Sequence, residues 1–246
     1  MVAALQLHLE AFVRLSRDDR ALINKLTSKN VRQIDARRDI IREGDKPRAV
    51  NIVLDGWGCR YKQLPDGRRQ VVAVFIPGDL CDANVFILRE MDHNIGAITR
   101  MRYAEIGAAD FEGLLLQSPR IAQALWWHEL VIAATQREWT TNVGRRSAFE
   151  RVAHLLCELF TRLRAVGLTN DGECEFPLTQ NDLADATGLT SVHINRTLQE
   201  LRRRDMIALE RRTLRIPDLD RLMDVCMFNP NYLHLDHEGR HLDAND

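Results

Sequence analysis

The sequence has few cysteines and no cluster of them. Its five cysteines are scattered over 246 residues, and no two of them form a Cys-x-x-Cys pair. An odd, unclustered set is typical of reduced thiols, so we predict neither a disulfide framework nor a zinc site. An iron–sulfur cluster needs a set of cysteine ligands, which the N-terminal region lacks.

Long apolar runs are also missing. No segment approaches the ~20 apolar residues that cross a bilayer. The first residues, MVAALQLHLEAFVRL, lack the basic start and the continuous apolar core of a signal peptide. The sequence therefore predicts a cytoplasmic protein with no membrane contact.

Net charge is close to zero, and the basic character of the chain is local. The whole sequence carries a formal charge of −1, with 45% hydrophobic and 28% charged residues, which is typical of a soluble globular protein. Between Arg196 and Arg215, however, seven arginines face three acidic residues, a local net charge of +4. Such a span indicates a surface for nucleic acid, although charge runs are often only solvated surface.

Residues 178–201 contain two short helical patterns separated by a break. Thr179 and Thr190 are candidate N-cap residues, and Gly188 between the helices tolerates the positive φ of a sharp turn. One face of the second helix is apolar at helical spacing: Ile194, Leu198 and Leu201. This arrangement predicts a helix-turn-helix that enters a major groove, although ordinary helical domains also contain such pairs.

The opposite face of the second helix is mostly polar and is followed by two short strand patterns. Strands over 206–210 and 213–216, joined by a basic turn, predict the wing of a winged helix-turn-helix. We expect four side chains to contact bases: Ser191, Val192, Asn195 and Arg196. We expect seven to contact phosphates: Thr179, Gln180, Thr190, His193, Arg202, Arg211 and Arg212.

The segment between residues 31 and 110 changes to a period of two, after a helical start over 1–30. Short strand patterns alternate with turn signals such as Asp55-Gly56, Pro65-Asp66-Gly67 and Pro77-Gly78-Asp79. This spacing predicts a closed, jelly-roll-like β unit. A metal-dependent barrel of the cupin type needs several histidine ligands, and His93 is the single histidine of this segment. No nucleophile with a partner histidine and no glycine-rich phosphate loop is evident, so we predict that the protein is not an enzyme.

A long helix is predicted from Arg120 to about Val143. Six of its residues follow the 4-3-4-3 spacing of a coiled-coil seam: Ile121, Leu125, His128, Ile132, Thr135 and Trp139. We expect this seam to form a homodimer, the alternative being a helix buried within its own subunit. Gly144 is the expected hinge after the helix, and Ser147 is expected to start the next one.

The predicted fold class is therefore α+β, in four parts. Residues 1–118 form N-terminal helices and a β-roll sensor domain, and 119–144 form the dimerisation helix and hinge. Residues 145–230 form the winged helix-turn-helix domain, and 231–246 a polar tail. The tail contains His234, Asp236, His237, Glu238 and His241, but such a tail is more often solvated than a metal site.

Several short motifs occur in a fixed order along nearly the whole chain: Ile41-Arg-Glu-Gly-Asp45, Leu54-Asp-Gly56, Pro65-Asp-Gly67, Pro77-Gly-Asp79 and the segment 178–207. In this order they resemble the Crp-Fnr family of bacterial transcription regulators. The resemblance implies a homodimer that binds a two-fold site on double-stranded DNA and acts on RNA polymerase. The alternative is a small-molecule-binding or protein-interaction module whose winged helix does not bind DNA.

The predicted recognition helix departs from the family pattern at one position. Where the family commonly has a glutamate, this sequence has Val192, while the arginine four places later is kept as Arg196. Valine accepts no hydrogen bond but can touch a thymine methyl group. We therefore expect the half-site to differ from the family's usual one at the base pair that faces Val192.

The effector region also departs from the cyclic-nucleotide members of the family. Those members carry Gly-Glu and a later Arg-Ser or Arg-Thr pair, whereas here Gly78-Asp79 has a shorter acid and residues 91–99 lack the pair. Arg89 is the nearby arginine that completes a weak candidate pocket with Gly78 and Asp79. We predict that cyclic AMP is not the ligand. No bound cofactor is predicted, while haem, for which His93 and His128 are weak candidates, or another small effector stays open.

Overall fold

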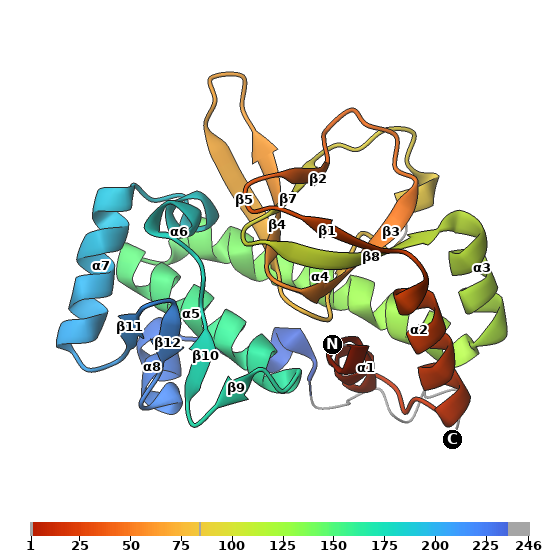
Figure 1. The fold of residues 1–246 in the computed structure, drawn as a ribbon. Helices are drawn as coiled ribbons and strands as arrows, with labels where there is room; N and C mark the ends of the chain where they lie inside the picture. Colours follow the sequence, from red (N-terminus) through yellow and green to blue (C-terminus); the bar gives the residue numbers. More distant parts are fainter. Residues whose placement is uncertain (1, 84, 236–246) are drawn as a thin grey trace.

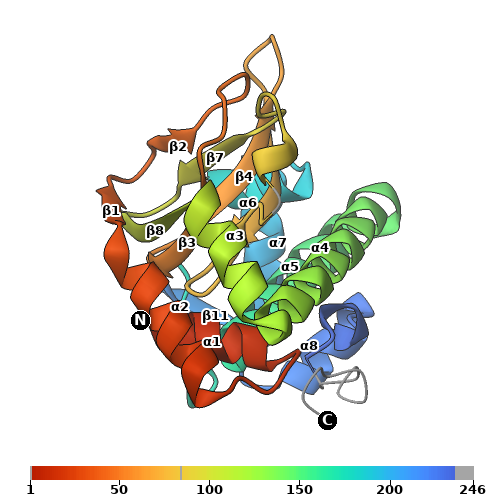
Figure 2. The ribbon, with the colours of Figure 1, turned by 90° about the vertical axis from the view of Figure 1, so that its right-hand side faces the viewer.

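The computed structural model describes residues 2–83 and 85–235 and has a β-roll beside a long helix and a smaller helical domain (Figure 1). The helices before α5 belong to the N-terminal part: α1 (Val2–Glu10), α2 (Arg17–Lys29), η1 (Val85–Ile87), α3 (Ala108–Gln117) and α4 (Pro119–Arg145). Ser16 and Asp19 form a capping box that starts α2. Figure 2 shows α1 and α2 at the lower end of the roll.

The roll consists, in the described residues, of two four-stranded antiparallel sheets. One sheet has the order β1-β8-β3-β6, and its strands are Val31–Ile34, Met101–Gly107, Ala49–Asp55 and Leu80–Cys81. The other has the order β2-β7-β4-β5, and its strands are Asp39–Ile41, Asn94–Ala97, Gly58–Gln63 and Arg69–Phe75. The jelly-roll-like unit predicted from the strand spacing is confirmed.

Two of the predicted turn glycines are required by the backbone. Gly56 has a φ of +79°, and a Cβ there would lie 2.3 Å from the carbonyl oxygen of Arg100. Gly78 has a φ of +98°, and a Cβ there would lie 2.8 Å from the carbonyl oxygen of Ala4. Both positions therefore exclude a side chain for steric as well as conformational reasons.

The long helix α4 begins as predicted but ends later. Ser118 caps it and Pro119 is in its first turn. The helix continues through Gly144 to Arg145, so the predicted helix break at Gly144 is wrong. A single glycine costs a helix only about 1 kcal/mol, which neighbouring packing can outweigh. The chain turns instead at Arg146, because Ser147 and Glu150 form a capping box that starts α5 (Ala148–Ala165).

The C-terminal part is a winged helix-turn-helix. Its helices after α5 are α6 (Gln180–Thr187), α7 (Ser191–Arg203), α8 (Leu219–Cys226) and η2 (Pro230–Leu233). A four-stranded sheet has the order β11-β12-β10-β9, and its strands are Ala208–Glu210, Thr213–Arg215, Glu173–Glu175 and Thr169–Asn170. The wing strands β11 and β12 are predicted by the sequence. The pair β9 and β10 has no strand pattern in the sequence, because strands of two and three residues are too short to show a period.

The apolar core does not divide at the predicted domain boundary near residue 144. One cluster of buried side chains joins the outer face of β4 and β5 to α5 and the winged domain, and includes Trp57, Val71, Leu156 and Phe176. A second cluster fills the roll, α1, α2 and the start of α4. The two halves are also linked by the Arg37 guanidinium, which donates to both carboxylate oxygens of Asp182 on α6. The division into domains stays a prediction.

No helix in the described part of the chain combines the length and apolar content needed to cross a membrane. The tail residues Asp236, His237, Glu238 and His241 lie outside the described residues.

Candidate nucleic-acid interface and effector cavity

The helix-turn-helix is held by its capping residues. The hydroxyl of Thr179 donates to the Asp182 carboxylate at 2.6 Å, and the Asp182 amide donates back to that hydroxyl at 3.2 Å. Gly188 lies in the left-handed region with a φ of +65° and closes α6. The Thr190 hydroxyl accepts from the His193 amide at 3.3 Å and starts α7. The caps and the turn inferred from the sequence are therefore present in the structure.

Helix α7 separates a buried stripe from an exposed face. Ile194, Leu198 and Leu201 are fully buried in the winged-domain core. Ser191, Val192 and Arg196 are exposed, and Val192 keeps 69% of its surface accessible. Asn195 is half-buried, and its side-chain amide donates to the Gln180 side-chain oxygen at 3.4 Å. The structure thus brings the four predicted base-contacting residues together on one accessible side of α7.

The predicted phosphate contacts fall into two groups. Thr179, Gln180, Thr190 and His193 are exposed at the first turns of α6 and α7, where free backbone N–H groups favour an anion. Arg211 and Arg212 are exposed at the tip of the wing, with φ values of +46° and +67°. Arg202 differs, because its guanidinium donates to the carbonyl oxygen of Leu209 at 2.9 Å and so braces the wing.

The predicted dimer seam on α4 faces inward. Ile121, Leu125, His128 and Trp139 are buried within the subunit, and Ile132 and Thr135 are half-buried beside a cavity. These side chains are therefore not available to a partner in this structure. The face that remains exposed carries the same 4-3-4-3 spacing five positions further along the chain: Trp126, Leu130, Ala133, Arg137 and Thr140. Trp126 and Leu130 leave 76% and 63% of their surface exposed, which is a large apolar area for a monomer.

The weak effector pocket predicted from Gly78, Asp79 and Arg89 is not assembled. One carboxylate oxygen of Asp79 accepts from the Ile76 amide at 2.8 Å and from Arg162 at 2.6 Å, so Asp79 closes its own turn and binds α5. The Arg89 side chain is 95% exposed and lies 3.7 Å from Glu90. Asp79 and Arg89 thus have different partners, which the sequence spacing alone does not reveal.

A buried charged cluster lies in the roll instead. The Arg60 guanidinium pairs with Asp82, whose other oxygen lies 2.9 Å from Nε2 of His93, and Nδ1 of His93 lies 2.7 Å from Asp92. Burial alone would raise the pKa of Asp82, but the hydrogen bond from His93 and the charge of Arg60 lower it below its ordinary value. Asp82 thus contacts both Arg60 and His93, while Nε of Arg60 is buried without a hydrogen-bond partner among the described residues. No sequence motif identifies this cluster.

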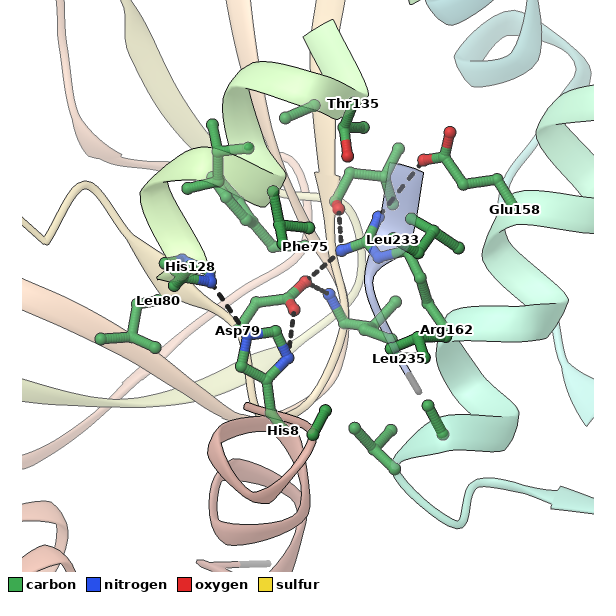
Figure 3. Close-up of a pocket in the computed structure, with 18 of the residues that line it drawn as sticks. His8, Phe75, Asp79, Leu80, His128, Thr135, Glu158, Arg162, Leu233 and Leu235 are labelled. Carbon is green, nitrogen blue, oxygen red and sulfur yellow. Dashed lines mark hydrogen bonds and ion pairs between the residues drawn. The ribbon is translucent and has the colours of Figure 1, made fainter. Parts of the chain in front are cut away.

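A cavity of about 80 Å³ lies where α1, β5, α4 and α5 meet (Figure 3). Its walls are mainly apolar, and its charged or polar side chains are His8, Arg60, Asp79, His128, Thr135, Gln136, Glu158 and Arg162. Nε2 of His8 lies 2.9 Å from Nδ1 of His128, and Nδ1 of His8 lies 3.8 Å from Asp79. Arg162 donates to Asp79 and to the Val74 carbonyl oxygen at 3.1 Å, and lies 3.6 Å from Glu158. Sequence reasoning identifies Asp79 and His128 but not that α1 and α5 complete the site.

The two cavity histidines are neutral near pH 7. Burial, with a smaller effect of the Arg162 charge, lowers the pKa of His8 to about 4. Burial, with the neighbouring His8, lowers the pKa of His128 to about 3. Burial raises the pKa of Glu158. Among the described residues, no three His, Cys, Asp or Glu side chains are arranged to hold a metal ion.

Both halves of the chain match known families. Residues 31–118 match the model of the cyclic nucleotide-binding domain, and residues 150–225 match the Crp-like helix-turn-helix domain. The solved structure of FixK2 from Bradyrhizobium japonicum superposes with a TM-score of 0.70 over 79% of this chain and 96% of that one, at 24% identity. This likeness shows the shared fold.

Two curated relatives are similar over most of their length. The transcriptional activator protein FnrL of Cereibacter sphaeroides is 30% identical over 204 residues, which are 80% of each chain. The nitrogen fixation regulation protein FixK of Bradyrhizobium diazoefficiens is 33% identical over 173 residues, which are 69% of this chain and 70% of that one. The chain is therefore a DNA-binding transcription regulator and belongs to the Crp-Fnr family.

Proposed function

We propose that the protein binds a palindromic DNA site as a homodimer, with α7 of each subunit in successive major grooves. The main observation behind this proposal is the exposed face of α7. The opposite face of the helix is fully buried, and exposed arginines of the wing follow the helix in the chain. A two-fold protein matches a two-fold site because each subunit reads one half of it.

The four side chains of α7 that we assign to base edges each have a chemical role there. Arg196 donates two hydrogen bonds to a guanine, and Asn195 pairs with an adenine once it leaves Gln180. Val192 contacts a thymine methyl group, and Ser191 accepts or donates at a neighbouring base. Thr179, Gln180, Thr190, His193, Arg211 and Arg212 hold phosphates, while Arg202 acts by bracing the wing.

The dimer forms through the exposed face of α4 rather than through the inward seam. The apolar side chains of Trp126 and Leu130 begin a stripe at heptad spacing that a second copy of the helix can cover. The polar end of the stripe, with Arg137 and Thr140, leads toward the DNA-binding half.

Cyclic AMP does not fit the roll as the effector. Arg60, Asp82 and His93 are bonded to one another inside it, so a cyclic phosphate would have to displace Asp82 from its arginine. The relatives are named as an activator and as a regulator of nitrogen fixation, and by analogy we infer action on RNA polymerase in the cytoplasm.

Binding of a labelled DNA duplex, measured by fluorescence anisotropy at several salt concentrations, tests this function. We expect affinity to fall steeply with salt, because cations are released from the phosphates. Arg196→Ala should cost about 1–3 kcal/mol on the preferred site and little on other DNA. Arg89→Gln, at an exposed side chain of the N-terminal part, is the control. Affinity that does not depend on salt would favour a protein-interaction module instead.

A further inference from the structure

The cavity described above joins the two halves of the chain. One wall comes from α1 and from Ala73–Ile76 of the roll, and the facing walls come from α4, α5 and the segment after α8, with Ala165, Leu233 and Leu235. The polar groups His8, Asp79 and Arg162 meet in one part of it (Figure 3), and apolar side chains form most of the remaining wall. Small-molecule sites commonly combine an apolar wall with a few convergent polar groups.

His128 lines this cavity and has one ring nitrogen without a hydrogen-bond partner among the described residues. The side chain is 5% exposed and its Nδ1 is bonded to His8, but its Nε2 has no partner among residues 2–83 and 85–235. Buried polar atoms without a partner are rare and call for an explanation. When the proton of His8 lies on Nδ1, which faces Asp79, Nε2 of His8 accepts from the Nδ1–H of His128. Nε2 of His128 is then a free acceptor.

The charges around the cavity disfavour an anion. Arg162 is already bonded to Asp79 and lies beside Glu158. Glu158 in turn accepts hydrogen bonds from the Trp139 indole at 3.0 Å and the Tyr232 hydroxyl at 2.8 Å. Arg60, the other arginine of the lining, is paired with Asp82. An added carboxylate would therefore meet acidic groups and two arginines that already have carboxylate partners, whereas a neutral molecule avoids this electrostatic cost.

We propose that this cavity binds a small, neutral, mainly apolar molecule that donates one hydrogen bond to Nε2 of His128. Its volume of about 80 Å³ is roughly half that of the ~150 Å³ cavity that binds benzene in another protein, so we expect it to take a ligand no larger than a single five-membered ring. The ligand touches both halves of the chain, so it can stiffen their arrangement. The site itself is tested without DNA, so failure of this proposal and failure of the DNA-binding function are distinguishable.

The test compares three probes of similar shape by titration calorimetry and protein NMR. Pyrrole carries an N–H donor, thiophene has the same ring size without a donor, and pyrrole-2-carboxylate adds a negative charge. We expect pyrrole to bind about ten times more tightly than thiophene, and pyrrole-2-carboxylate to bind more weakly than either. Equal binding of pyrrole and thiophene, or tightest binding of the carboxylate, would overturn the proposal.

Variants locate the binding in the cavity. His128→Phe keeps a ring but removes the acceptor, so the preference for pyrrole over thiophene should disappear. Ala165→Phe fills the cavity from α5 and should abolish binding of both probes, and it keeps the test decisive if the His128 variant does not fold. Arg89→Gln, whose side chain is 95% exposed, is the control and should bind all three probes as the parent does. An unchanged pyrrole preference in folded His128→Phe, or unchanged binding in Ala165→Phe, would place the ligand elsewhere.

Discussion

The helices α7 and α4 show when apolar spacing identifies a face and when it does not. Helix α7 has one apolar stripe, and its residues Ile194, Leu198 and Leu201 are the buried ones. Helix α4 has two apolar stripes, and the one chosen from the sequence as the dimer seam is buried against its own subunit. A helix packed in its own subunit and a helix in a coiled coil show nearly the same apolar spacing. The spacing therefore identifies the buried face only when a single face of the helix is apolar.

Charging each face of α4 in turn should give the largest effects. Leu130→Glu adds a charge to the exposed face, so we expect a folded monomer whose DNA affinity is about 10²–10⁴-fold lower, because the two half-sites no longer bind together. Leu125→Glu, five residues earlier and buried, should instead prevent folding. Analytical ultracentrifugation and circular dichroism separate these outcomes. A Leu130→Glu protein that stays dimeric would restore the inward seam as a candidate.

Features set by neighbouring residues can be predicted from this sequence, whereas contacts between residues far apart in the chain cannot. The caps at Thr179 and Thr190 and the turns at Gly56, Gly78 and Gly188 depend on neighbouring residues, and the structure has them where the sequence indicates. The cavity depends on His8 meeting His128 across 120 positions, and the roll cluster on Arg60 meeting Asp82. Such pairs follow from the topology of the chain, so a single sequence contains no local pattern for them.

Acid should destabilise the packing around α4, because buried histidines lie on α1, α4 and α5. The pKa values of His8, His128 and His154 are lowered to about 4, 3 and 3, in each case mainly by burial. The unfolded chain therefore binds more protons below pH 6.5, and stability should fall as the pH drops from about 6.5 toward 4. Thermal unfolding at pH 7 and pH 5 measures the loss. His128→Phe should reduce the difference, and an unchanged difference would contradict the assignment.

The smallest effect is expected at Gly144, the predicted hinge. In the structure this residue lies in the last turn of α4, and a Cβ there meets nothing within 4 Å. Gly144→Ala should therefore raise the free energy of unfolding by about 0.5–1 kcal/mol without changing DNA affinity. Urea unfolding combined with the DNA titration measures both quantities. A loss of DNA affinity would show that flexibility at this position matters after all.

Selection of binding sites from random DNA tests the central claim most directly, when the parent protein is compared with Val192→Glu. Val192 is exposed on α7, so the substitution should leave the fold intact. We expect the parent to select a two-fold site and the variant to change one symmetrically placed base pair in each half, with cytosine gaining where the new carboxylate can accept from its amino group. Sites without two-fold symmetry, or identical sites for both proteins, would contradict the account.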